Sequence, residues 1–108
     1  MERKNTWETY SEEQLAQLER LNVEYRSFLD NGKTERECID YIVNRIEEAG
    51  YCELEQLVKE NKTLQAGDKV YSVCMNKSIV MYQIGKRSMA EGMNILGAHL
   101  DSPRLDVK

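Results

Sequence analysis

Apolar residues recur at helical spacing in the first part of the chain, between residues 11 and 31. Ser11 followed by Gln14 is typical of a capping box, in which each side chain satisfies a backbone amide of the first turn. The stripe that follows consists of Leu15, Leu18, Tyr25, Phe28 and Leu29. Because Asn31 and Gly32 then interrupt the pattern, the sequence predicts an amphipathic helix that ends there.

A second amphipathic helix is predicted directly after the first. Thr34 and Glu37 form another capping-box pair, and Gly50 is placed to end the helix in a left-handed cap. The apolar face between them consists of Cys38, Ile39, Ile42, Val43, Ile46 and Ala49. Each helix needs an apolar surface to cover, so we expect both to pack against the sheet that follows.

The periodicity changes from helical to alternating after a mixed segment, residues 51–64. Lys69–Met75 and Ser78–Ile84 are predicted to form a β-hairpin, with Asn76-Lys77 as the tight connection. Both predicted strands carry apolar residues on both faces, which indicates at least partial cover on each side.

A last apolar run, Met93–Ala98, is predicted to be a buried strand. The expected architecture is therefore α/β: two amphipathic helices followed by a β-hairpin and a buried strand. In open α/β sheets, ligands bind beyond the carboxyl ends of the strands, and His99 follows this run directly.

Composition narrows the class of protein. The chain has 108 residues, 41% of them apolar, which is the size of one small domain. Its 19 acidic and 15 basic residues give a net charge of -4, so nucleic acid and anionic membranes are not expected partners. The start of the chain lacks the features of a secretory signal, and no apolar run approaches the roughly 18 residues of a membrane-spanning helix. A soluble, cytoplasmic protein is expected.

The three cysteines do not form a metal or disulfide pattern. Cys38, Cys52 and Cys74 are separated by 14 and 22 residues, far from any C-x-x-C spacing. An odd number of cysteines with apolar neighbours favours reduced thiols in the core.

The only histidine, His99, is followed two residues later by Asp101. In extended backbone these two side chains project to the same face while Leu100 points away. His99 can then bind a metal through one ring nitrogen while Asp101 lies close to the other nitrogen or to a metal-bound water. Pro103 favours extended backbone past this point. The pattern is short, however, and a lone histidine near a strand is more often a structural residue than a metal ligand.

A longer string points to one family. Leu96–Asp106 closely resembles the first metal-binding motif of the aspartyl aminopeptidase, or aminopeptidase I, family of zinc metallopeptidases, in the wording of its bacterial members. Three upstream segments resemble the same family in the same order: Lys33–Cys38, Gly50-Tyr51 and Gly67–Tyr71. The resemblance extends over nearly the whole chain.

The resemblance implies roles for both site residues. His99 corresponds to a metal ligand in a two-zinc site, and Asp101 to the catalytic carboxylate that orients the metal site. The implied reaction is removal of N-terminal residues, acidic ones in the family's name, from peptide substrates by metal-activated water. The general base and remaining ligands of the family lie downstream of Lys108, and no substrate-binding residue can be assigned; neither Arg104 nor Lys108 is identified as the cationic group of an acidic-residue pocket.

The resemblance also implies a larger assembly. Residues 1–108 correspond to the N-terminal, incomplete portion of a doubly covered α/β catalytic domain, which in the family is interrupted by a domain used for dimer contacts. Members form cytosolic homo-oligomers, and this portion alone is expected to be inactive.

Two alternatives remain open from the sequence. One is a small non-catalytic α/β interaction module in which His99 is structural. The other is an independent metal-binding protein that uses His99, Asp101 and Asp106.

Overall fold

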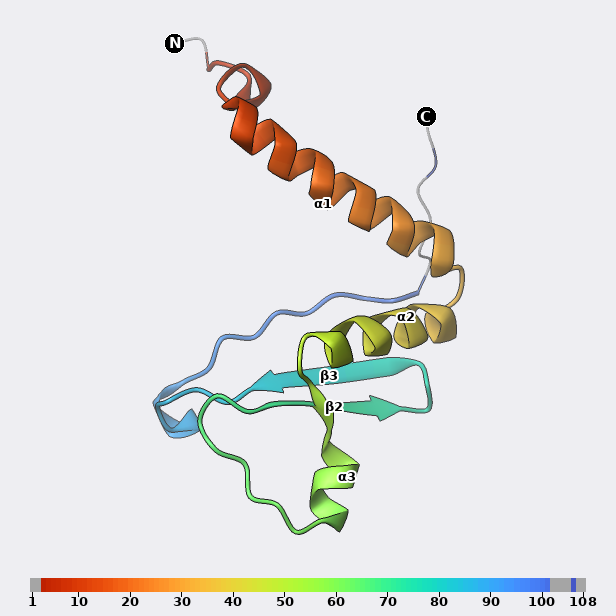
Figure 1. Ribbon diagram of the computed structural model, residues 1–108, viewed down its shortest axis with the longest axis vertical. Helices are drawn as coiled ribbons and strands as arrows, with labels where there is room; N and C mark the ends of the chain where they lie inside the picture. Colours follow the sequence, from red (N-terminus) through yellow and green to blue (C-terminus); the bar gives the residue numbers. More distant parts are fainter. Residues whose placement is uncertain (1–2, 102–105, 107–108) are drawn as a thin grey trace.

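The computed structural model describes residues 3–101 and 106 (Figure 1). Two helices dominate the first half, and a small mixed sheet occupies the second. The elements in chain order are η1 (Thr6–Glu8), α1 (Glu12–Asn31), α2 (Glu35–Glu48), β1 (Cys52–Glu53), α3 (Leu54–Lys59), β2 (Lys69–Cys74), β3 (Ser78–Gln83) and η2 (Met89–Glu91). The α/β class predicted from the periodicity is confirmed.

Both predicted helices begin at their capping boxes. The Gln14 amide donates to Ser11 Oγ at 3.2 Å, and the Ser11 amide donates to Gln14 Oε1 at 2.9 Å. Thr34 and Glu37 make the same reciprocal pair at the start of α2, at 3.3 and 2.9 Å. Each pair satisfies amides that have no partner within the helix, so the sequence fixes where both helices start.

The end of α2 is also the predicted one. Gly50 has a φ of +90°, which favours glycine because a Cβ is strained there. Its amide donates to the Glu47 carbonyl at 2.9 Å, and the Tyr51 amide donates to the Ile46 carbonyl at 3.0 Å. These two bonds are the Schellman pattern, which turns the chain sharply into β1.

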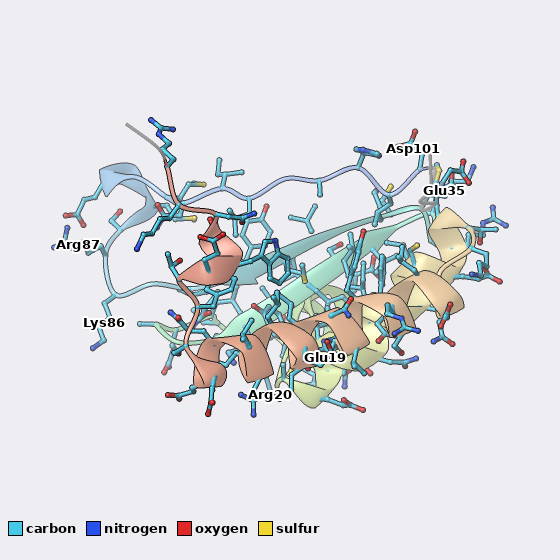
Figure 2. All side chains as sticks on the ribbon, turned by 90° about the horizontal axis from the view of Figure 1, so that it is seen from above. Glu19, Arg20, Glu35, Lys86, Arg87 and Asp101 are labelled. Carbon is cyan, nitrogen blue, oxygen red and sulfur yellow. The ribbon has the colours of Figure 1, made fainter. Side chains whose placement is uncertain are left out.

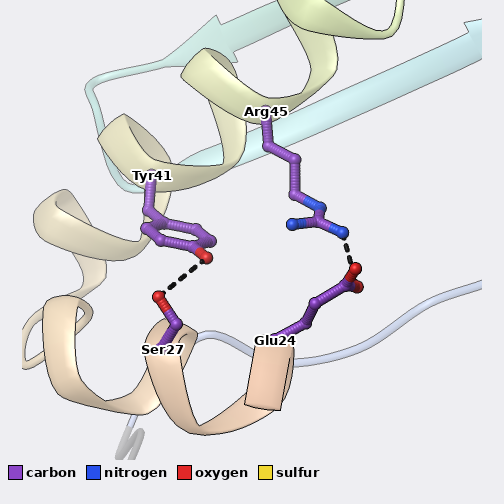
Figure 3. Close-up of polar contacts among 4 residues, drawn as sticks. All are labelled: Glu24, Ser27, Tyr41 and Arg45. Atoms are coloured by element: carbon purple, nitrogen blue, oxygen red, sulfur yellow. Dashed lines mark hydrogen bonds and ion pairs between the residues drawn. The ribbon is translucent and has the colours of Figure 1, made fainter. Parts of the chain in front are cut away.

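The last turns of α1 are joined to α2 by side-chain contacts (Figure 3). Arg45 Nη2 lies 2.6 Å from Glu24 Oε2, and the Tyr41 hydroxyl lies 3.4 Å from Ser27 Oγ. The Tyr41 ring also meets Phe28 edge to face, with 5.5 Å between ring centroids. The residues of α1 in these contacts all lie in its second half, and its first half extends away from the sheet (Figure 1).

The three strands form one sheet in the order β1-β2-β3. The hairpin of β2 and β3 is antiparallel, with Lys69 opposite Gln83 and Cys74 opposite Ser78. Its turn lies one residue earlier than predicted, because Met75 and Asn76 have positive φ and the Lys77 amide closes the turn on the Cys74 carbonyl. β1 adds a two-residue parallel strand that the sequence did not predict.

The core is built from residues of α2 and of β2, the central strand. Its buried apolar residues are Cys38, Ile39, Val70 and Tyr71. Val70 and Tyr71 are adjacent in β2 and therefore face opposite sides of the sheet, so the predicted cover on both faces is correct for β2. It is wrong for most of β3, where Val80, Met81 and Tyr82 are about half exposed, at 50%, 46% and 46%. Helix α2 covers the sheet, as predicted. Helix α1 was also expected to pack against the sheet, but it packs on α2.

The predicted buried strand at Met93–Ala98 is not formed. This segment is extended coil, and Leu96 is fully exposed. A strand requires a neighbour that pairs with its backbone amides and carbonyls, and β1, β2 and β3 pair only with one another in the described part of the chain. The prediction that this apolar segment is a buried strand is therefore wrong.

The cysteines were predicted to be reduced and buried; the first prediction is correct, and the second holds for one of the three. Cys38, Cys52 and Cys74 are all free thiols, and Cys38 is buried. Cys52 and Cys74 are exposed, because one lies in the two-residue edge strand and the other at the last position of β2.

Candidate metal-ligand pair

His99 and Asp101 lie at the end of the extended segment that follows η2. In Figures 1 and 2 this segment runs along the molecule and ends beside the connection between α1 and α2, where Figure 2 labels Asp101. The two side chains are 81% and 71% exposed, and Leu100 between them is half-buried. The alternation predicted from the sequence therefore places His99 and Asp101 outward and Leu100 inward.

The His99 ring is held by Asp101 through one nitrogen. Nδ1 lies 3.0 Å from Asp101 Oδ1 and 3.1 Å from the Asp101 carbonyl oxygen. Both oxygens are acceptors, so these contacts require a proton on Nδ1, which donates to them. In the neutral ring, the lone pair then resides on Nε2. This is the arrangement found in metal sites, where a ligating histidine donates its other ring N–H to a carboxylate or carbonyl.

The pair is not part of a complete metal centre within the described residues. Among residues 3–101 and 106, no group of three or more His, Cys, Asp and Glu side chains is placed to hold a metal ion. The three-ligand site considered from the sequence, His99 with Asp101 and Asp106, is therefore not formed. The stretch Ser102–Leu105 and Lys108, with the constraint expected from Pro103 and the candidate cations Arg104 and Lys108, lies outside the described residues.

Two concave regions of the described surface lie away from this pair. One, of about 680 Å³, is lined by Trp7 of η1 and by residues of α1 between Leu15 and Tyr25. The other, of about 420 Å³, lies between α2 and β2 and is lined in part by Asp40, Asn44 and Asn76. The side-chain nitrogen of Asn76, Nδ2, donates to Asp40 Oδ1 at 3.3 Å and so links the hairpin turn to α2. Sequence reasoning did not find this second region, because its residues are far apart in the chain and follow no pattern.

Comparison with known proteins agrees with the fold and with the resemblance. Residues 28–108 match the family described as aminopeptidase I zinc metalloprotease (M18). The class is thus that of metallopeptidases with an α/β fold. The chain belongs to the aminopeptidase I (M18) family.

Relatives share the chain's sequence over nearly all its length. A probable M18 family aminopeptidase 1 from Clostridium acetobutylicum is 42% identical over 99% of this chain, and one from Thermotoga maritima is 33% identical over all of it. The crystal structure of aminopeptidase I from Borrelia burgdorferi B31 superposes with a TM-score of 0.74, at 31% identity over 83% of the chain. The chain spans only 23% and 22% of the two relatives and 21% of the crystallised chain. The relatives are bacterial, as the wording of the motif predicted.

No helix in the described part of the chain has both the length and the apolar character required to cross a membrane.

Proposed function

We propose that the full-length protein containing this chain is a zinc aminopeptidase that releases N-terminal residues from peptides. Two observations support the proposal: membership in the aminopeptidase I zinc metalloprotease family, and the contact between His99 Nδ1 and Asp101. The contact between His99 and Asp101 is the observation on which the residue assignments rest, because it leaves the other imidazole nitrogen available to bind a metal. The stand-alone interaction module has no comparable support, since the matched family is one of metalloproteases.

His99 is proposed as a ligand through Nε2. With Nδ1–H donated to Asp101, Nε2 presents a lone pair on a ring that is 81% exposed, which fits the chemistry of zinc. A catalytic zinc takes about three protein ligands, so the remaining ligands of a two-zinc centre belong to the rest of the polypeptide. When bound, the metal supplies Lewis-acid polarisation of the scissile carbonyl and a water of lowered pKa.

Asp101 is proposed as the carboxylate that orients this ligand. Its two acceptors, Oδ1 and the carbonyl oxygen, lie within 3.1 Å of the same ring nitrogen and so fix both the tautomer and the direction of the ring. Removing the carboxylate charge leaves the carbonyl contact but weakens the hydrogen bond, because charge-assisted bonds are about twice as strong as neutral ones.

The remaining features of the proposal concern the whole protein. Residues 1–108 are proposed to be the N-terminal portion of its catalytic domain and to be inactive alone, because the general base and further ligands lie elsewhere. Acidic N-terminal residues are the substrate class to test first. We further propose a cytoplasmic homo-oligomer, in line with the net charge of -4 and the exposed apolar face of α1.

The test uses the full-length protein and measures bound zinc together with hydrolysis of peptides that have free N-termini. His99→Ala should lower both the zinc content and the activity, the latter by about a hundredfold or more. Asp101→Asn should retain more zinc than His99→Ala while losing activity. Glu55→Gln, on the exposed surface of α3, is the matched control and should change neither. Full zinc content and full activity in His99→Ala protein would refute the assignment.

A further inference from the structure

Leu100 lies between the proposed metal ligand and its orienting carboxylate, and it is turned inward. From Gly85 to Asp101 every residue is exposed except Leu100, which is half-buried. The same segment contains a second leucine, Leu96, whose side chain is fully exposed. Apolar character alone therefore does not bury a side chain of this segment, and the burial is specific to position 100.

The backbone of residues 93–101 is not held by the rest of the described chain. The last described backbone hydrogen bond before this segment joins the Gly92 amide to the Met89 carbonyl, and the three strands of the described part pair only with one another. The contacts of His99 with Asp101 are internal to the pair. Among residues 3–101 and 106, the Leu100 side chain is therefore the group available to place the pair against the molecule.

The segment ends at the connection between α1 and α2. Figure 1 shows it crossing the molecule to this connection, and Figure 2 labels Asp101 next to Glu35, the first residue of α2. Glu35 is half-buried, although it is charged. Because Leu100 directly precedes Asp101 and is turned toward the molecule, the surface nearest to its side chain is this connection.

The connection is a rigid support. Gly32 is buried, and it is so closely packed that a Cβ added there would lie 2.7 Å from Cys38 Sγ. The Lys33 and Thr34 amides both donate to Glu37 Oε2 at 2.9 Å. Tightly packed backbone whose amides are satisfied has few alternative positions. A side chain that rests on it therefore has a fixed place.

A metal ligand requires such a fixed place. The contact with Asp101 orients the His99 ring relative to its own backbone, but it does not place that backbone relative to ligands elsewhere in the polypeptide. Site residues are held to within about 0.5 Å of their working geometry by the packing around them. Leu100 meets this requirement without touching the metal, because successive side chains of an extended segment point to opposite sides.

We propose that Leu100 is a positioning residue for the metal site, and that its side chain holds the His99–Asp101 pair against the connection between α1 and α2. The inference rests on the proposed role of His99 as a zinc ligand, and it adds a residue that acts through His99. A positioning role changes how tightly the folded protein binds zinc. A merely structural role changes only how much of the protein is folded.

The test measures the zinc dissociation constant of the full-length protein by competition with a chelator, for the site that His99→Ala removes. Thermal unfolding establishes the folded fraction of each sample. Leu100→Ala should raise the dissociation constant about tenfold, as loss of the support of a metal ligand does. Leu100→Met, which nearly conserves the side-chain volume, should restore most of the affinity. Leu96→Ala, the same truncation in the same segment, is the matched control and should bind zinc as the parent does.

A double-variant cycle tests the place of the contact. Gly32→Ala displaces the packed connection and should weaken zinc binding about threefold on its own. In Leu100→Ala protein it should add little further loss, because the pair is then no longer coupled to the connection.

The outcomes separate this inference from the proposed function. Parental zinc affinity in Leu100→Ala, an equal loss in Leu96→Ala, or no recovery in Leu100→Met would overturn the positioning role. No loss in Gly32→Ala, or losses that add in the double variant, would overturn the placement against the connection. Zinc retained in full by His99→Ala would instead refute the proposed zinc ligand itself.

Discussion

The hydroxyl of Tyr71 donates a hydrogen bond to Glu47 Oε1 at 2.6 Å, and this side-chain bond ties the central strand to the helix covering it. Tyr71 lies in β2 and is 5% exposed, while Glu47 lies in the last turn of α2. The contact spans 24 residues of sequence and therefore reports tertiary packing and not local structure.

Tyr71→Phe should lower the free energy of unfolding by about 1 kcal/mol, since it removes a hydrogen bond whose acceptor remains accessible to water. Urea unfolding of the variant and of the unmodified chain measures the difference. Tyr82→Phe, about half exposed on β3, is the control and should unfold as the parent does. Equal losses in the two variants would show that the contact contributes nothing specific.

The same contact predicts loss of stability in alkali. Hydrogen bonding to Glu47, together with burial, raises the pKa of Tyr71 from 10 to about 12. The folded protein therefore keeps the phenolic proton over a range in which the unfolded chain loses it. The resulting contribution is complete below pH 10 and declines as the pH rises toward 12. Unfolding measured over this range should show the decline in the parent and a smaller one in Tyr71→Phe; parallel curves would contradict the prediction.

Gly32→Ala should destabilise the elbow between α1 and α2. An added Cβ would lie 2.7 Å from Cys38 Sγ and 3.1 Å from the Phe28 carbonyl oxygen, so the buried thiol would have to move. A cost of about 1–3 kcal/mol is expected from such overpacking, measured by thermal or urea unfolding. Adding Cys38→Ala should recover part of the loss. Gly97→Ala, where nothing lies within 4 Å, is the control.

Thiol labelling should separate the three cysteines. Cys52 and Cys74 are exposed and should react with a maleimide in the folded chain, whereas Cys38 should react only on unfolding. Burial, together with the neighbouring carboxylates Glu37 and Glu35, also raises the pKa of the Cys38 thiol and so disfavours the reactive thiolate. Mass spectrometry of native and denatured samples should count two and three labels; three in the native sample would show that the α2 core opens.

The helices and the hairpin were predictable because their signals are local. Ser11 with Gln14 and Thr34 with Glu37 are each three residues apart, and Gly50 terminates α2 through its own φ. β1 and α3 were missed because two and six residues are too few to show a period. The partner of β1 lies 18 residues downstream at Val70, which no local pattern indicates.

Burial was predicted less well than secondary structure. The apolar residues of α1 and of Met93–Ala98 were expected to be covered by the sheet. An apolar pattern shows that a segment favours burial, but it does not show which surface covers it. Of the candidate site, the contact of His99 with Asp101 followed from their spacing in extended chain.

The contact between His99 and Asp101 is closed across a single intervening residue. Closing so short a loop restricts little chain, so the contact has a low entropic cost and does not depend on distant segments. The orientation of the ring is thus encoded within three consecutive residues. The contact can therefore form independently of the order in which other segments of the protein fold.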